Sequence, residues 1–200
     1  MFERFTKDAR AVVLGAVGHA ERLNAETVEE QHMLLALLDR EASRASFALT
    51  SLGLADRRES VKRALAEARR RGGLSRADAD ALSGLGIDLS KIVSRVEEAH
   101  GEGALEAERK GAERKGAGRG KGWWSGFVGG HRPFTQGAKD VLTESLRIAL
   151  AQRDRYIGDE HLLLALAARP GVPAEALADH GVTYASLRRV LYGGGEAKAG

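Results

Sequence analysis

Apolar residues recur along the first part of the chain at the three- and four-residue spacing of amphipathic helices. In the first such stretch, residues 7–23, they are Ala9, Val12, Val13, Ala16, Val17, Ala20 and Leu23. The next segment runs to Leu38 and is apolar almost all round, and Thr27 and Glu30 have the spacing of a capping box at its start. A third helix is expected between Ser43 and Gly53, and a fourth over residues 56–71. The pattern predicts a helical unit with the leucine-rich helix at its centre.

The same pattern returns later in the chain at a constant offset. Phe134 stands 129 residues after Phe5 (134 − 5), and the offset holds without a gap up to Leu37 and Leu166. It pairs Val12 with Val141, Ala20 with Ala149, Val28 with Ile157, His32 with His161, and Leu35 with Leu164. An ungapped match of this length indicates a duplicated folding unit. Because each copy has only a short one-sided core, we expect an all-α fold in which two repeats pack about a pseudo-twofold axis.

The repeats are assigned to residues 1–72 and 133–192, and the chain between them differs in character. Residues 73–100 predict an inserted helical hairpin, in which Leu85-Gly86-Ile87 resembles the earlier ending Leu52-Gly53-Leu54. Residues 101–132 predict a flexible, basic, Gly-rich linker, and residues 193–200 a disordered tail.

Both tryptophans of the chain, Trp123 and Trp124, fall in the linker. Two adjacent tryptophans are costly to leave in water, so they are expected to dock near Phe134 as a built-in competitor of external ligands. The alternatives are a bait for another protein or a cover for the hairpin.

The amino-acid composition limits the kinds of function that the chain can have. The chain is 43% hydrophobic but only 5% aromatic, which favours a helical core of Leu, Val and Ala, and its net charge is +3. It has no cysteine, which excludes disulfides, thiolate nucleophiles and Cys-ligated zinc. No signal peptide opens the chain and no apolar run reaches membrane-spanning length, so a cytoplasmic protein without membrane contact is expected.

The repeated motif carries a family resemblance. A Phe-Thr pair, an Ala-rich helix and then Glu-His-Leu-Leu-Leu-Ala-Leu at residues 160–166 resemble the Clp amino-terminal (Clp R) domain, closest to the ClpC type. This domain stands at the front of the Clp/Hsp100 ATP-driven unfoldases. The resemblance covers residues 1–65 and 131–192 and implies partners among Clp substrates, adaptors and unfoldase or protease components.

The resemblance also implies a binding site. ClpC-type domains present a groove between the first helices of the two repeats, which receives substrates, adaptors and cyclic-peptide antibiotics. The matching positions are Phe2, Arg10, Val13, Phe134, Lys139, Leu142 and Leu146. Apolar anchors flanked by a few cations suit an apolar peptide. The alternative is that Val13 and Leu146 are core residues.

Some family members also bind phosphoarginine through a Glu at the start of each leucine-rich helix. The matching residues are Gln31 and Glu160. Gln31 is neutral, and Asp159 places an acid where the family usually has Thr, so both departures weigh against phosphate binding.

No catalytic pattern accompanies the repeats. Gly120-Lys121 is followed by Gly122 and lacks the spacing of a phosphate-binding loop, and no hydrolase motif is present. His32 and His161 share one repeat position and are expected to bond neighbouring backbone, the alternative being a catalytic pair. We therefore expect a stand-alone, non-enzymatic regulator, decoy or adaptor of Clp-dependent proteolysis, without cofactor or metal. The alternative is an interaction protein whose basic linker binds nucleic acid or an acidic partner. Added salt should abolish binding of this kind.

Overall fold

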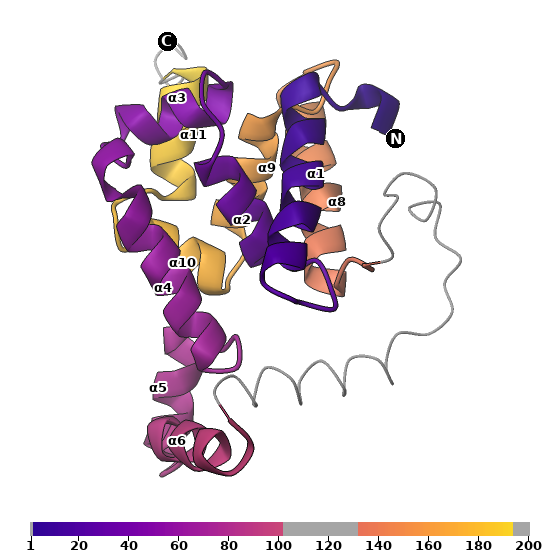
Figure 1. Ribbon diagram of the computed structural model, residues 1–200. Coiled ribbons are helices and arrows are strands. Elements are labelled where there is room, and N and C mark those ends of the chain that lie inside the picture. The colour runs from indigo at the N-terminus through magenta and orange to yellow at the C-terminus, as the bar shows by residue number, and fades with distance from the viewer. Residues whose placement is uncertain (1, 102–131, 194–200) are drawn as a thin grey trace.

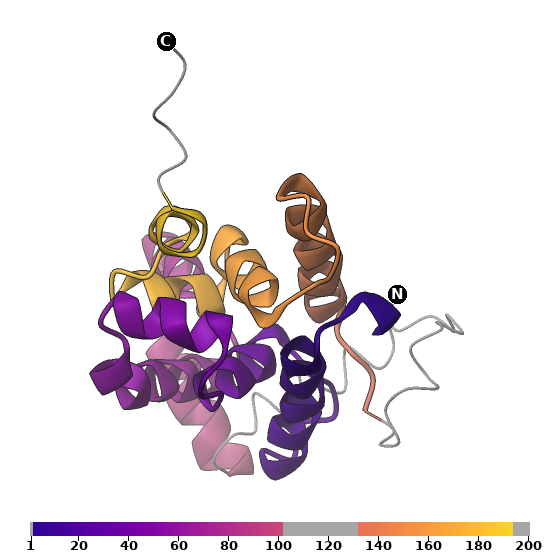
Figure 2. The same cartoon turned by 90° about the horizontal axis from the view of Figure 1, so that it is seen from above.

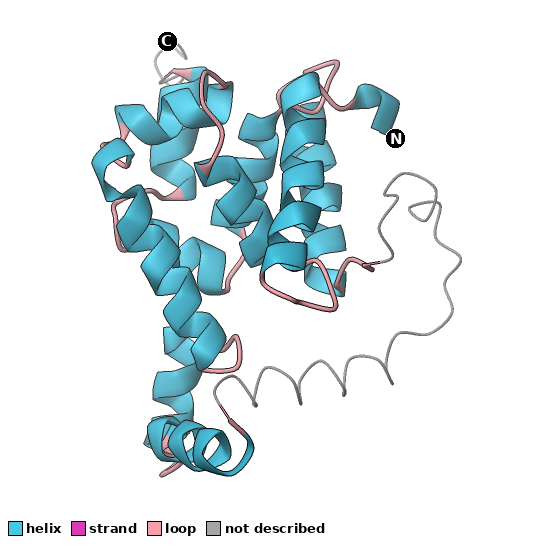
Figure 3. Ribbon diagram, viewed as in Figure 1, coloured by secondary structure: helices cyan, strands magenta, loops and turns pink. Residues whose placement is uncertain are grey.

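The computed structural model describes residues 2–101 and 132–193, and in these ranges the chain is all-α, as predicted (Figures 1 and 3). The first repeat consists of the 3-10 turn η1 (Phe2–Arg4), α1 (Lys7–Arg22), α2 (Glu30–Leu38), α3 (Arg44–Ser51), the 3-10 turn η2 (Ala55–Arg57) and α4 (Arg58–Arg70). Two helices follow, α5 (Arg76–Gly84) and α6 (Leu89–His100). The second repeat consists of α8 (Gln136–Ala151), α9 (Asp159–Ala168), α10 (Val172–Ala178) and α11 (Tyr184–Tyr192).

The first helix of each repeat begins in the same way. The hydroxyl of Thr6 accepts a hydrogen bond from the Ala9 N–H, and that of Thr135 accepts one from the Ala138 N–H, both at 3.2 Å. The two threonine caps that the sequence predicts are therefore confirmed.

The start of the leucine-rich helix differs from the prediction. The Thr27 capping box is wrong, because α2 begins at Glu30 with Glu29 as its N-cap. The Glu29 N–H donates to Nδ1 of His32, and in the second repeat the Gly158 N–H donates to Nδ1 of His161, both at 2.9 Å. The repeated histidine thus caps its own helix by bonding neighbouring backbone, as expected.

Two isolated β-bridges tie each repeat to the other. Phe5 pairs with Ile157, and Val28 pairs with Phe134. Adding 129 to Phe5 and Val28 gives Phe134 and Ile157, so the second bridge is the first with the repeats exchanged. The hydrogen bonds exchange as well: Thr6 N–H donates to Ile157 O at 2.9 Å, and Thr135 N–H donates to Val28 O at 3.0 Å. The two repeats are therefore related by a pseudo-twofold axis.

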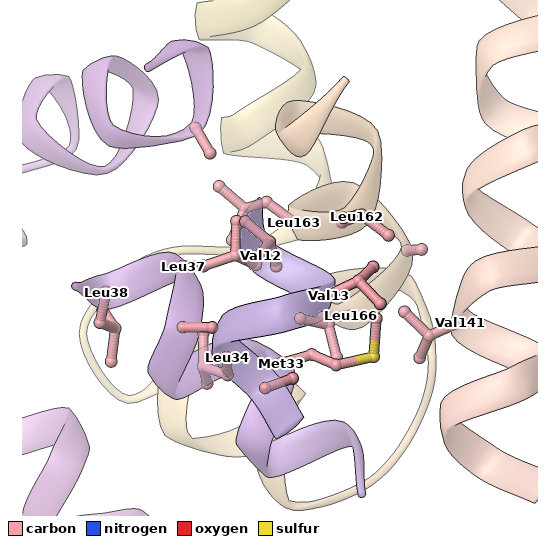
Figure 4. Packing of buried hydrophobic residues seen from close by; sticks show 14 of the residues in the cluster. Val12, Val13, Met33, Leu34, Leu37, Leu38, Val141, Leu162, Leu163 and Leu166 are labelled. Carbon is pink, nitrogen blue, oxygen red and sulfur yellow. The ribbon is translucent and has the colours of Figure 1, made fainter. Parts of the chain in front are cut away.

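The leucine-rich helices α2 and α9 lie at the centre of the molecule (Figures 1 and 2). Figure 2 shows them between α1 and α8 on one side and α3, α4, α10 and α11 on the other. Met33, Leu34, Leu37, Leu162, Leu163 and Leu164 are fully buried, and several of them meet in the cluster of Figure 4. Since a buried leucine contributes about 1.5–3 kcal/mol, these two helices dominate the stability of the fold.

The helices α5 and α6 stand apart from this core (Figure 1). None of their residues is buried. They are held at the start of α5, where the carboxylate of Glu175 accepts hydrogen bonds from the Arg76 N–H at 2.7 Å and the Ala77 N–H at 3.3 Å. This hairpin therefore adds little to the burial that stabilises the two repeats.

Several helix ends share one geometry. Gly53, Gly86 and Gly181 have φ of 75°, 81° and 77°, which glycine adopts without a steric penalty. The next residue then bonds back to the helix, as Leu54 N–H does to Leu49 O and Ile87 N–H to Leu82 O, both at 2.9 Å. The likeness of the Gly53 and Gly86 sequences thus reflects a common backbone conformation.

Trp123, Trp124, the basic linker and the tail after Gly193 lie outside the described residues. Within the described part of the chain, no helix is both long enough and apolar enough to cross a membrane.

Candidate functional site

Two rows of accessible side chains lie on α1 and α8, which occupy the same side of the molecule (Figures 1 and 2). The α1 row consists of Arg10 and Leu14, and the α8 row consists of Lys139, Leu146 and Leu150; each row follows one helical face. Leu14 is 52% exposed and Leu150 is 56% exposed. Each row begins with a cation at the same repeat position, since 10 + 129 = 139. Exposed apolar side chains next to a cation suit an apolar peptide segment.

The structure brings together only part of the predicted groove. Val13, Phe134 and Leu142 belong to the core and are at most 7% exposed. Figure 4 shows Val13 of α1 and Val141 of α8 directed toward the same group of α2 and α9 side chains. These predicted groove residues thus lie beneath the surface, because the apolar stripe that contains them faces the neighbouring helices.

The accessible residues of the predicted groove are Arg10, Lys139 and Leu146. The Arg10 Nε donates to the Phe5 carbonyl at 3.1 Å, which holds the guanidinium near the start of α1. Phe2 lies in η1, and its side chain is outside the described atoms. The sequence analysis did not assign Leu14 and Leu150 to the site. They could have been found because each is a leucine that lies outside the apolar stripe of its own helix.

A second cluster surrounds the start of α9, where Asp159 and Glu160 are 2% and 4% exposed. The Arg44 guanidinium of α3 reaches across from the first repeat, and its Nη1 lies 2.7 Å from Oε1 of Glu160. The Ala45 N–H donates to Oδ2 of Asp159 at 3.3 Å. Arg44 also lies over the ring of Tyr192, 5.8 Å from its centroid. The acids of one repeat therefore hold the first turn of α3 in the other.

Burial is the main cause of the pKa shifts in this cluster. Removal from water raises the pKa of Glu160 to about 7, and the Asp159 charge adds to the rise while Arg44 opposes it. Burial, followed by the Glu160 charge, raises the pKa of Tyr192 to about 12. Burial also lowers the pKa of His161, against the opposing effect of Asp154. The Arg44–Glu160 pair is therefore sensitive to pH near neutrality.

Asp154, Glu160 and His161 place ligand atoms within 4.8 Å of one another, as a metal site would require. However, Nδ1 of His161 already accepts the Gly158 N–H, so the proton of the neutral ring is on Nε2. Nε2 lies 3.0 Å from Asp154 Oδ2 and 2.9 Å from the Tyr192 hydroxyl. Because both ring nitrogens are engaged in hydrogen bonds, the cluster is suited to structural bonding rather than to a metal ion.

The corresponding place in the first repeat is organised differently. Gln31 is buried and its Nε2 donates to Glu29 Oε2 at 2.6 Å. A pocket of about 320 Å³ opens beside these residues, and Val172 lines it at the place that Arg44 holds in the other copy, since each is the first residue of its helix. Of the two residues predicted for phosphoarginine, Glu160 is thus paired with Arg44 and Gln31 with Glu29.

Comparisons with known proteins find similarity to Clp proteins. Residues 133–197 match the family described as the Clp repeat (R) N-terminal domain. Over 189 residues the chain is 30% identical to an ATP-dependent Clp protease ATP-binding subunit ClpA homolog of Cyanidium caldarium, a match that covers 94% of this chain and 16% of the relative. It is also 30% identical to the chloroplastic chaperone protein ClpC1 of Arabidopsis thaliana, covering 94% of this chain and 14% of that protein.

A solved structure also resembles the chain. It is the N-terminal domain of the caseinolytic protease associated chaperone ClpD from Arabidopsis thaliana, with a TM-score of 0.48 and 16% identity, covering 96% of this chain and 94% of that one. The chain spans about one sixth of the length of the curated relatives that it matches.

Proposed function

The chain carries a Clp repeat N-terminal domain, and from this premise we propose that it is a non-catalytic peptide- and protein-binding module of Clp-dependent proteolysis. Its ligands are substrate or adaptor proteins of Clp chaperones, bound at the α1 and α8 rows. The observation that carries the proposal is the pair of exposed leucines, Leu14 and Leu150, each on a helix whose row begins with a cation.

The chemistry of the rows favours reversible binding of unfolded or extended segments. Leu14 and Leu150 offer apolar contact area, while Arg10 and Lys139 can bond carbonyl oxygens or carboxylates of a bound chain. The most polar buried cluster, around His161, is engaged in bonds within the protein. That cluster therefore stabilises the fold, and we assign ligand binding to the surface rows on α1 and α8.

Casein labelled with a fluorophore is a suitable unfolded probe for this surface. The double variant Leu14→Glu/Leu150→Glu should weaken binding, measured by fluorescence anisotropy, by about tenfold or more, since each substitution removes apolar contact. Phe47→Glu is the matched control, because Phe47 is a 63% exposed apolar residue on α3, away from both rows. If the control weakens binding as much as the double variant, the rows are not the site.

Such a module acts by competing for, or delivering, the ligands of an unfoldase. In excess, the chain should therefore slow degradation of casein by a ClpC-type unfoldase and its protease, and the double variant should not. Calorimetry with a groove-directed cyclic-peptide antibiotic tests the same rows with a small ligand. Inhibition that is equal for the wild type and the double variant would contradict competition through this surface.

A further inference from the structure

The hairpin of α5 and α6 carries apolar side chains that the rest of the described chain does not cover. None of the residues of either helix is buried, and Figure 1 shows α6 at the end of the molecule farthest from α3 and α11. Leu85 is 78% exposed, Ile87 is 39% exposed and Ile92 is 40% exposed. Helices of 9 and 12 residues are only marginally stable without a packed apolar face. A partner that covers these side chains would therefore stabilise the hairpin.

α6 presents an exposed row of side chains beside the face that packs on α5. The packed face is apolar and half-buried, and it consists of Leu89, Val93 and Val96. The exposed row begins at the N-cap and follows the spacing of four, three and four residues that aligns positions along a helix. It consists of Asp88, Ile92, Arg95 and Ala99. This α6 row therefore carries an acid, an apolar side chain, a cation and a small residue, in that order.

The two charges of the α6 row are accessible. Arg95 has no ion-pair partner within the described residues. Asp88 caps α6, since its Oδ1 accepts the Lys91 N–H at 3.2 Å, and its Oδ2 lies 3.3 Å from Lys91 Nζ. The Lys91 side chain is 83% exposed, so this ion pair contributes little to stability. A carboxylate has several acceptor positions, and Asp88 can therefore bond an arginine of another molecule while it caps the helix.

The α6 row is complementary to itself when two copies lie antiparallel. A twofold axis beside Ile92 places this side chain against its own copy. Asp88 and Arg95 lie four residues before and three residues after Ile92, so each carboxylate meets the guanidinium of the other copy. Ala99 then faces the turn that carries Leu85, and its small side chain leaves room for that leucine. A parallel pair would instead place like charges opposite each other.

We propose that the α6 row is the contact surface of a dimer and that its occupant is a second copy of this chain, lying antiparallel. Charge complementarity selects this occupant, because the row matches itself in order and in sign. The row is short, so the dimer is weak and forms only as the concentration of the chain rises. The proposal is independent of peptide binding, because the α1 and α8 rows lie on other helices.

Sedimentation velocity of the full chain, from micromolar to millimolar concentration, measures the association. The weight-average mass should rise from that of one chain toward that of two. Ile92→Glu should raise the dissociation constant about tenfold or more, because it sets two carboxylates against each other across the axis. A mass that stays at one chain throughout would overturn the proposal. If Ile92→Glu also moved the tryptophan fluorescence of that monomer to longer wavelength, the face would belong to Trp123 and Trp124 of the same chain.

Charge reversal tests the antiparallel order. Arg95→Glu should weaken association about tenfold or more. Adding Asp88→Asn should recover part of this loss, because asparagine keeps the helix cap and removes the opposed charge. The matched control is Arg57→Glu, which makes the same change of charge at an exposed position of η2 and should associate as the wild type does. Equal loss in Arg95→Glu and Arg57→Glu would reduce the effect to overall charge and refute the proposal.

A single introduced thiol locates the axis, since the chain has no cysteine of its own. Ile92→Cys should form a disulfide between two copies under mild oxidation, because the axis brings the two thiols within bonding distance. Ser94→Cys is the control: Ser94 is also exposed, but it lies about 200° around the helix from Ile92 and should give no cross-link. Equal cross-linking of the two variants would place the contact elsewhere and contradict the proposed arrangement.

Discussion

Replacing Glu160 by glutamine should alter how the stability of the protein depends on pH. Glu160 is 4% exposed and joins the two repeats through Arg44. Glutamine has nearly the same shape and does not titrate. The fold already accepts glutamine at the equivalent position, since Gln31 stands 129 residues before Glu160. Comparing the variant with the wild type therefore measures how the titration of one buried carboxyl contributes to stability.

The sign follows from the direction of the shift. Burial raises the pKa of Glu160 from 4.5 to about 7, so the folded chain binds this proton more tightly than the unfolded chain does. The stability that the protonated carboxyl contributes is complete below pH 4.5 and is lost as the pH rises through about 7. At about 1.4 kcal/mol for each tenfold change in the dissociation constant, the loss is about 3 kcal/mol.

Urea unfolding followed by helical circular dichroism at pH 4.5 and pH 8 measures the effect. The free energy of unfolding of Glu160→Gln, minus that of the wild type, should rise by about 3 kcal/mol between these two pH values. The lost ion pair with Arg44 contributes to the absolute difference, so the test is the change with pH. A difference that stays constant, or that moves in favour of the wild type as the pH rises, would refute the argument.

Other substitutions test the packing and the caps. Leu164→Ala should lower the free energy of unfolding by about 2–5 kcal/mol, whereas Leu35→Ala should cost less because Leu35 is only partly buried beside a pocket; urea unfolding compares them. Thr6→Ala should cost about 1 kcal/mol, and Thr135→Ala should cost somewhat more, because the cap bonds are alike but the Thr135 hydroxyl also donates to the Val28 carbonyl at 3.4 Å. Arg153→Gly should raise the melting temperature slightly, since Arg153 has φ of 60° and glycine adopts that conformation without a penalty.

The repeated helices could be predicted from the sequence because their apolar residues follow the helical period twice at one offset. Most boundaries follow from local signals such as Thr6, Thr135 and Gly53. The bond between His32 and neighbouring backbone was expected, but the cap of α2 was assigned to Thr27, because Thr27 and Glu30 have the spacing of a capping box. Val13 and Leu142 were assigned to a groove from the family resemblance, although both lie among the periodic apolar residues of their helices and are buried in the core.

Contacts between residues far apart in the sequence could not be predicted from local patterns. Arg44 and Glu160 are 116 positions apart, and nothing in the sequence near either residue indicates the other. Such sites arise from packing, which the period of one helix does not specify.

The exchanged bridges between Phe5 and Ile157 and between Val28 and Phe134 have a consequence for ancestry. Each bridge joins the entry of one repeat to the loop of the other, and exchanging the repeats converts one bridge into its mate. This is the isologous interface of a C2 homodimer, in which residue i contacts j and j contacts i. A single ancestral repeat could have assembled in this way before its gene was duplicated and fused. In such a fold the covalent connection raises the effective concentration of the two halves, and α5 and α6 lie along it without contributing buried residues.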